Sequence, residues 1–202
     1  RQNKQIQDDF EKVERLSMDM LTALVGTIEA KDYYTSGHSI RVAKYSRMIA
    51  EEMRLSSEDV EAIHKMAIMH DIGKIGIQDD MITKPGKLTA EEYEIVKQHP
   101  AKGADILEGI EDMPRLFMGA KYHHERWDGK GYPFGIAGEE IPLEARIISV
   151  ADAYDAMTSV RSYRTALEQD VVISEIKKGI GSQFNPEVAY AMLNIISRDK
   201  DY

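Results

Sequence analysis

The sequence predicts an all-α fold. Apolar residues recur at helical spacings of three and four along most of the chain, and no segment of any length shows the alternating pattern of a β-strand. The chain has 202 residues, of which 43% are hydrophobic, so it can form one domain with a sizeable core and an appended segment. We expect a linker or signalling helix at residues 1–30 and the domain at residues 31–202.

Composition narrows the classes of function. The formal net charge of −9 argues against a general DNA or RNA binder, because nucleic-acid affinity depends mostly on basic surface. The absence of cysteine excludes disulfides and thiolate metal sites and fits the reducing cytoplasm. No apolar run approaches the roughly 18 residues of a membrane span, so we expect no membrane contact by this segment. Because the chain opens at Arg1 rather than at methionine, we expect a longer full-length protein, which could be membrane-anchored upstream.

The N-terminal helix is expected over residues 3–31. Charged residues occupy other faces up to about residue 20, and an apolar stripe runs along one face: Ile6, Phe10, Val13, Ser17, Met20, Leu24 and Ile28. This stripe either packs only on the chain's own domain or pairs with a second copy. We favour a signalling helix that forms a homodimer as a coiled coil and connects the domain to an upstream sensor or receiver domain.

The next elements are placed by turn and capping signals. After a turn that contains glycine, a helix is expected over residues 38–53. The segment from Ser56 to Asp59 resembles a capping box and begins a helix that ends at His70. Residues 75–88, which contain a Pro-Gly pair, are expected to form an irregular loop.

A second capping box, from Thr89 to Glu92, begins a helix that carries His99 at its end, because the following Pro100 should stop it. A loop is expected at residues 125–142, ERWDGKGYPFGIAGEEIP, which hold four glycines and two prolines. The remaining helices are expected at residues 101–110, 114–124, 143–160, 168–178 and 186–197.

Residues 65–78, KMAIMHDIGKIGIQ, contain the most informative pair, His70 and Asp71. An imidazole supplies a neutral nitrogen and the adjacent carboxylate can bridge two cations, so the pair suits a metal site. Lys74 is the nearest cation and would be a charge partner for a metal-bound phosphate. Alone, the pair is also explained by a helix C-terminus at which His70 meets the helix dipole and Asp71 is solvated.

Further histidines and one helical aspartate strengthen the metal interpretation. His38, His99, His123 and His124 lie near carboxylates, glycines or cations, and Asp152 occupies an apolar helical run, IISVADAYDAMTS. Adjacent side chains on a helix point about 100° apart, so His123 and His124 can reach one cation only where their helix ends or is distorted.

Six blocks in order connect these residues to a known family: DYYTSGHSIRVAKYS, HDIGKIGI, KPGKLTAEEYEIVKQHP, HHERWDGKGYP, IISVADAYDAMTSVRSYR and GSQFNPEV. On these blocks, residues 29–190 resemble the HD-GYP family of metal-dependent phosphodiesterases within the wider HD superfamily. The resemblance implies an HD-type helical bundle and hydrolysis of a cyclic dinucleotide, typically cyclic di-GMP, in bacterial second-messenger signalling.

The resemblance also implies a two-metal site. One ion would be held by His38, His70, Asp71 and Asp152, and the other by Asp71, as the bridge, with His99, His123 and His124. Because imidazoles and carboxylates are the ligands, we expect the two divalent ions to be Fe or Mn. Asp71 and Lys74 are the expected catalytic residues.

Residues around the metals have expected roles as well. Asp155, one turn after the last ligand, would orient a ligand histidine. Lys74, Arg161 and Arg164 would bind the substrate by neutralising phosphate oxygens, the alternative for the two arginines being a solvated basic turn.

The residues that give the family its name are Gly131, Tyr132 and Pro133. We expect them to form a loop that shapes the mouth of the site or docks a partner, for which a GGDEF-type cyclase domain is a candidate. The alternative is a rigid surface loop with no role beyond structure.

One departure from the family bears on the product. Tyr34 stands where some members have a glutamate that helps to hold a third metal, so we expect two metals and linear pGpG rather than GMP. Two other functions stay open: a catalytically weak or inactive module that binds cyclic dinucleotides and docks other domains, and an HD-type hydrolase of another nucleotide, such as cyclic GMP-AMP.

Overall fold

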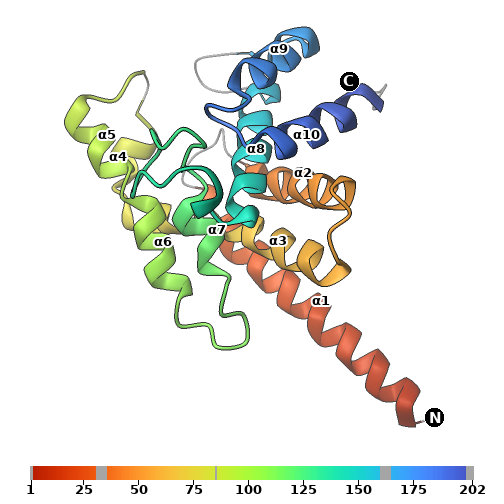
Figure 1. Cartoon of the computed structure of the whole chain (residues 1–202). Helices are drawn as coiled ribbons and strands as arrows, with labels where there is room; N and C mark the ends of the chain where they lie inside the picture. Colours follow the sequence, from red (N-terminus) through yellow and green to blue (C-terminus); the bar gives the residue numbers. More distant parts are fainter. Residues whose placement is uncertain (1, 31–35, 85, 160–164, 199–202) are drawn as a thin grey trace.

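The computed structural model describes residues 2–30, 36–84, 86–159 and 165–198 (Figure 1). Within these ranges the regular secondary structure is helical, as predicted, and the one strand-like feature is an isolated bridge between Ile180 and Phe184. No helix in these ranges combines the length and the apolar character that crossing a membrane would need. The elements are α1 (Gln2–Glu29), α2 (His38–Glu52), α3 (Ser57–Met69), η2 (Ile72–Gly76), α4 (Asp79–Ile82), α5 (Ala90–Val96), α6 (His99–Leu107), α7 (Phe117–Tyr122), η3 (Gly138–Glu140), α8 (Leu143–Thr158), α9 (Gln169–Gly179) and α10 (Pro186–Arg198).

Helix α2 packs against α3 and α8, and α10 packs across both α2 and α8. On the other side of the domain, α6 contacts α7 and η2, and α7 in turn contacts α3 and α8. The side chains of Ile49, Ile63, Ile147 and Ile148 are almost completely buried at these junctions, and each such burial contributes about 1.5–3 kcal/mol. The core therefore fixes the relative positions of α2, α3, α7 and α8.

Helix α1 uses two different faces. Val25 and Ile28, near its C-terminal end, are buried against the domain, where α1 contacts α3 and η2. Ile6, Val13 and Met20 are between 62% and 65% exposed, although they are large and apolar. Figure 1 shows the N-terminal half of α1 extending away from the body of the protein. The predicted long helix is confirmed, and packing on its own domain leaves most of its apolar stripe uncovered.

The predicted helix starts at the two capping boxes are confirmed. The Ser56 hydroxyl accepts a hydrogen bond from the backbone N–H of Asp59 at the start of α3. At the start of α5, the Thr89 hydroxyl accepts from the N–H of Glu92, and the Glu92 carboxylate accepts from the N–H of Thr89. These bonds satisfy backbone donors that the first helical turn would otherwise leave unpaired.

The expected end of the helix that begins at Thr89 is wrong. Helix α5 ends at Val96, and His99 is the first residue of α6 rather than the last residue of the preceding helix. Pro100 occupies the first turn of α6, where a residue without an N–H is tolerated because that N–H would have no helical partner. The proline therefore begins a helix here instead of ending one.

Two further boundaries differ from expectation. The segment 75–88 is not wholly irregular, because it contains the end of η2 and the one-turn helix α4. Helix α7 is shorter than the expected 114–124 because the preceding segment forms turns, in which Leu116 N–H donates to the carbonyl of Met113. Helix α7 ends at Tyr122, so His123 and His124 lie just beyond a helix end, where both can face one point.

Candidate metal centre

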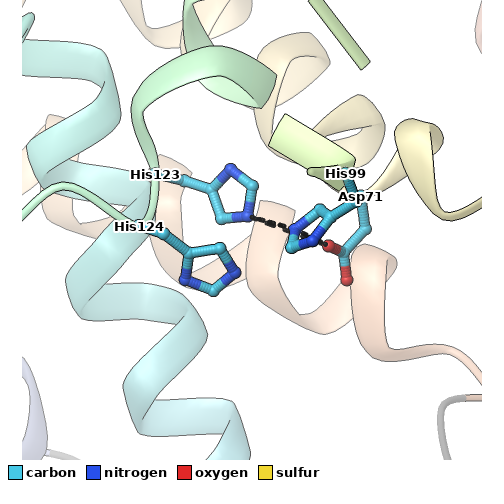
Figure 2. Close-up of side chains that lie close together, drawn as sticks. All are labelled: Asp71, His99, His123 and His124. Carbon is cyan, nitrogen blue, oxygen red and sulfur yellow. Dashed lines mark hydrogen bonds and ion pairs between the residues drawn. The ribbon is translucent and has the colours of Figure 1, made fainter. Parts of the chain in front are cut away.

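Five segments deliver the predicted ligands to one place. His38 is the first residue of α2, His70 and Asp71 follow α3, and His99 is the first residue of α6. The remaining three come from the end of α7 (His123 and His124) and from α8 (Asp152). The ligands therefore lie mostly at helix ends, where short side chains from different helices converge. Figure 2 shows Asp71, His99, His123 and His124 directed toward one another.

Close backbone packing explains why the segment after Asp71 meets α6. A Cβ atom on Gly73 would lie 2.0 Å from the carbonyl oxygen of His99 and 2.5 Å from the backbone nitrogen of Gly103. Only glycine allows η2 to approach α6 this closely. The approach brings Asp71 beside the imidazole of His99.

The two carboxylate oxygens of Asp71 face different histidines. Oδ1 lies 3.2 Å from Nε2 of His99 and 3.8 Å from Nε2 of His123. Oδ2 lies 3.5 Å from Nε2 of His70 and 3.8 Å from Nε2 of His38. Two groups of side chains therefore share Asp71, and each has ligand atoms close enough to hold an ion: His38, His70 and Asp71 in one group, and Asp71, His99, His123 and His124 in the other.

Hydrogen bonds at Nδ1 fix the tautomers of three histidines. Nδ1 of His70 lies 2.7 Å from the carbonyl of Ala67, Nδ1 of His99 lies 2.8 Å from that of Val96, and Nδ1 of His123 lies 2.9 Å from that of Ala120. A carbonyl only accepts, so each Nδ1 must carry the proton and each Nε2 must present a lone pair.

These buried lone pairs suit a cation. Nε2 of His70 is buried and has no hydrogen-bond partner among the described residues. Nε2 of His99 and Nε2 of His123 lie 3.3 Å apart with no proton to share between them. Burying acceptors in this arrangement is costly unless a metal or another donor lies among them. The residues present therefore fit divalent metal ions.

The protonation states also suit metal binding, which requires neutral imidazoles and an ionised carboxylate. Burial lowers the pKa of His70 to about 4 and that of His123 to about 3. Burial likewise holds the pKa of His124 well below its usual value. Burial alone would raise the pKa of Asp71, but the Lys74 ammonium, with contributions from the neighbouring His70 and His99, holds that pKa well below its ordinary value.

His38 is held from both sides. Its Nδ1 bonds Asp155 at 2.7 Å, while its Nε2 lies 3.4 Å from Asp152. Asp155 is buried and also accepts two hydrogen bonds from the Arg41 guanidinium, at 2.6 and 3.2 Å. Burial alone would lower the pKa of His38, but its bond to Asp155 and the charges of Asp152 and Asp71 raise it. Asp152 lies beside this histidine and outside the two tighter groups around Asp71.

Two residues that support the site were not singled out from the sequence. Arg41 shares a face of α2 with His38, but that spacing alone does not reveal its bonds to Asp155. Glu125 is buried and accepts hydrogen bonds from the backbone N–H groups of Phe134, at 2.7 Å, and Gly135. It closes the loop that carries Gly131–Tyr132–Pro133. A carboxylate next to two histidines is a signal that could have drawn attention to Glu125.

The predicted loop at the mouth lies directly on the site. Tyr132 N–H donates to the carbonyl of His124 at 3.2 Å, and the two rings stack with centroids 4.7 Å apart. A Cβ on Gly131 would lie between 2.4 and 2.6 Å from backbone atoms of residues 124–126, so glycine is required there.

The predicted substrate-binding residues are only partly located. Lys74 lies in the centre, with Nζ 2.5 Å from Oδ2 of Asp71. Arg161 and Arg164 lie outside the described residues, and so does Tyr34, on which the expected number of metals depends.

Comparisons with known proteins agree with this geometry. A sequence model of the family described as "HD domain" matches residues 23–188. The chain is 40% identical over 185 residues to "Cyclic di-GMP phosphodiesterase response regulator RpfG" of Xanthomonas campestris pv. campestris (strain 8004), covering 90% of this chain and 49% of that protein. It is 38% identical over 173 residues to "3'3'-cGAMP-specific phosphodiesterase 3" of Vibrio cholerae, covering 86% of this chain and 38% of that protein.

A solved structure shares the fold. The crystal structure of a cyclic GMP-AMP specific phosphodiesterase of V. cholerae superimposes with a TM-score of 0.69 at 17% identity, covering 90% of this chain and 49% of the other. This chain therefore has the all-helical fold predicted from its sequence. It spans about half the length of the curated relatives it matches.

Proposed function

The chain belongs to the HD domain family, in agreement with its resemblance to the HD-GYP proteins, and from this premise we propose that it is a metal-dependent phosphodiesterase that hydrolyses cyclic di-GMP. The observation that carries the proposal is the sharing of Asp71 between two groups of histidines. A bridging carboxylate between two sets of imidazoles suits a pair of divalent ions for phosphodiester hydrolysis.

The two faces of Asp71 support the proposed ligand sets. His38, His70, Asp71 and Asp152 would hold one ion, and Asp71, His99, His123 and His124 would hold the other. Imidazole and carboxylate ligands suit Fe and Mn. When bound, such ions polarise the phosphoryl oxygens and lower the pKa of the attacking water.

The chain's own residues then position and neutralise the substrate. Asp71 stays ionised and holds the two halves of the site together, while Asp155 keeps the His38 ring in place. Lys74 lies within reach of a phosphate bound beside Asp71 and supports the developing charge, together with Arg161 and Arg164. Burial of His38, His70, His99 and His123 limits the access of water to their ring nitrogens.

Two relatives suggest two substrates. A 40% identical relative is named a cyclic di-GMP phosphodiesterase, and a 38% identical one is named a 3'3'-cGAMP-specific phosphodiesterase. We favour cyclic di-GMP as the substrate. We favour linear pGpG as the product because the proposed ligand set holds two ions. Cyclic GMP-AMP is the second candidate, because the relative named for it is nearly as similar to this chain.

We also propose that the chain forms a homodimer through α1. Ile6, Val13 and Met20 recur every seven residues on the uncovered face of α1, which is the pattern of a helix that pairs with its own copy. This pattern supports the part of the proposal in which the chain forms a homodimer through α1; the proposal also places it in the cytoplasm and connects α1 to an upstream sensor or receiver domain. The chain spans about half the length of the curated relatives it matches, which leaves room for such a domain.

Product analysis tests the proposal. The chain is purified under reducing, oxygen-free conditions, loaded with Mn(II) or Fe(II) and incubated separately with cyclic di-GMP and with cyclic GMP-AMP. We expect linear pGpG as the accumulating product, resolved by chromatography. Rapid accumulation of GMP would contradict the two-ion assignment, faster cleavage of cyclic GMP-AMP would favour the second candidate, and no product with two bound ions would contradict hydrolysis.

A further inference from the structure

His124 differs from the other histidines of the centre. His38, His70, His99 and His123 each have Nδ1 bonded to a carboxylate or a backbone carbonyl. Among the described residues, no hydrogen bond is made by either ring nitrogen of His124. A metal-binding histidine is ordinarily oriented by a partner at its second nitrogen. Within the described ranges, ring contacts are what can hold this imidazole in place.

Aromatic rings surround His124 instead. The His99 ring meets it edge-on at 5.0 Å, and the His123 ring is tilted at 4.1 Å. The Tyr132 ring stacks on it, with the centroids 4.7 Å apart and an angle of 28° between the planes. His99 and His123 are candidate ligands of the same ion, so within the described part of the chain Tyr132 is the one neighbouring ring from outside the ligand set. A pair of this kind contributes about 0.5–1.5 kcal/mol beyond the area it buries.

The backbone holds Tyr132 in that place. Its N–H donates to the carbonyl of His124, so the loop returns across the residue whose ring it covers. Gly131 allows this return, because a side chain there would collide with the backbone of residues 124–126.

Helix α5 supports the outer side of Tyr132. The Tyr93 ring meets the Tyr132 ring edge-on at 6.4 Å. Nζ of Lys97 lies 5.3 Å from the centre of the Tyr93 ring and 5.9 Å from that of the Tyr132 ring. A lysine over two aromatic faces attracts both and favours their contact.

We propose that Tyr132 is a positioning residue for His124. The Tyr132 ring fixes the plane of the His124 imidazole, which then binds the ion that it shares with Asp71, His99 and His123. Tyr93 and Lys97 hold Tyr132 in turn. The inference rests on the proposed two-ion site and assigns to the loop a task distinct from contact with substrate. Stacking requires the ring and not the hydroxyl, so replacement by phenylalanine should preserve the function.

Metal titration distinguishes positioning of His124 by Tyr132 from contact of Tyr132 with substrate. Mn(II) is titrated into the metal-free wild-type chain and the Tyr132→Phe and Tyr132→Leu variants, and affinity is measured by calorimetry with metal content by mass spectrometry. We expect Tyr132→Leu to weaken one of the two ions by about 10–100-fold, the range for loss of an orienting partner, and to leave the other unchanged. Tyr132→Phe should match wild type.

Two further variants distinguish a specific loss of metal binding from a folding defect. Tyr93 is 47% exposed, so Tyr93→Leu removes the outer contact at little risk to the core, and it should weaken the same ion by a smaller factor. Phe134→Leu is the matched control, because Phe134 lies in the same loop, is 53% exposed and contacts Tyr122 rather than a ligand. It should bind both ions as wild type does.

The inference is overturned if Tyr132→Leu binds both ions normally and only raises the KM for the dinucleotide, or if Tyr132→Phe is as damaging as Tyr132→Leu. A wild-type chain that binds fewer than two ions would contradict the proposed site as well. Normal binding of two ions without hydrolysis would contradict only the proposed activity.

Discussion

Asp71 is the residue on which the centre depends. Its two oxygens face His99 and His123 on one side and His70 and His38 on the other. The four Nε2 atoms converge on one carboxylate because each of these rings is fixed through Nδ1. At this scale the site consists of imidazole donors, held by the backbone or by Asp155, around the carboxylate of Asp71.

Asp155 offers a test of that orientation. Asp155→Ala leaves His38 Nδ1 without its acceptor, so we expect metal affinity to fall by about 10–100-fold, with turnover reduced accordingly. Affinity is measured by Mn(II) titration. Asp105→Ala, at an exposed position of α6, is the control. Wild-type affinity in Asp155→Ala would show that His38 needs no orienting partner.

At the scale of the elements, the site depends on how closely helices approach. Gly73 packs against the backbone of α6, and this contact places Asp71 beside His99. Glu29, at the end of α1, accepts hydrogen bonds from the N–H groups of Gly37 and Ser39, both at 2.7 Å. Those amides flank His38 at the start of α2, so α1 is tied to one end of the metal centre.

Gly73→Ala should destabilise the fold. The added methyl group would meet the His99 carbonyl at 2.0 Å, and overpacking of this kind costs about 1–3 kcal/mol. Gly26→Ala, where nothing lies within 4 Å in helix α1, should instead stabilise by up to about 1 kcal/mol. Urea denaturation measures both. Equal stabilities for the two variants would contradict the close approach of η2 to α6.

Glu29→Ala should also destabilise the fold, in this case by about 0.5–2 kcal/mol, because two amides at the start of α2 lose their acceptor. Glu29→Gln keeps one acceptor oxygen and should lose less. The same denaturation experiment checks this order. A Glu29→Ala variant as stable as wild type would mean that α1 is not tied to α2 through these bonds.

The sequence predicted helices well and their junctions less well. Capping boxes at Ser56 and Thr89 mark real helix starts because the signal is local. Pro100 was misassigned because proline is compatible with the residue after a helix and with the first turn of the next one, and only packing decides between them. The stacking of Tyr132 on His124 joins residues eight positions apart through a folded loop, which no periodicity indicates.

At the scale of the whole molecule, α1 has an apolar face that the domain does not cover. Ile6, Val13 and Met20 remain largely exposed while Val25 and Ile28 pack inward. Removing residues 1–20 should therefore convert a dimer to a monomer, since the exposed stripe lies mostly in that segment. Light scattering of the two chains measures this. An unchanged oligomeric state would contradict pairing through α1.

The central claim is that Asp71 bridges two divalent ions. Metal content per chain, measured by mass spectrometry after Mn(II) loading and desalting, tests it most directly in wild type and Asp71→Ala. We predict two ions per wild-type chain and none in the variant, which should also lose turnover, because each group of histidines loses its shared anion. Two ions retained in a folded Asp71→Ala chain would contradict the account.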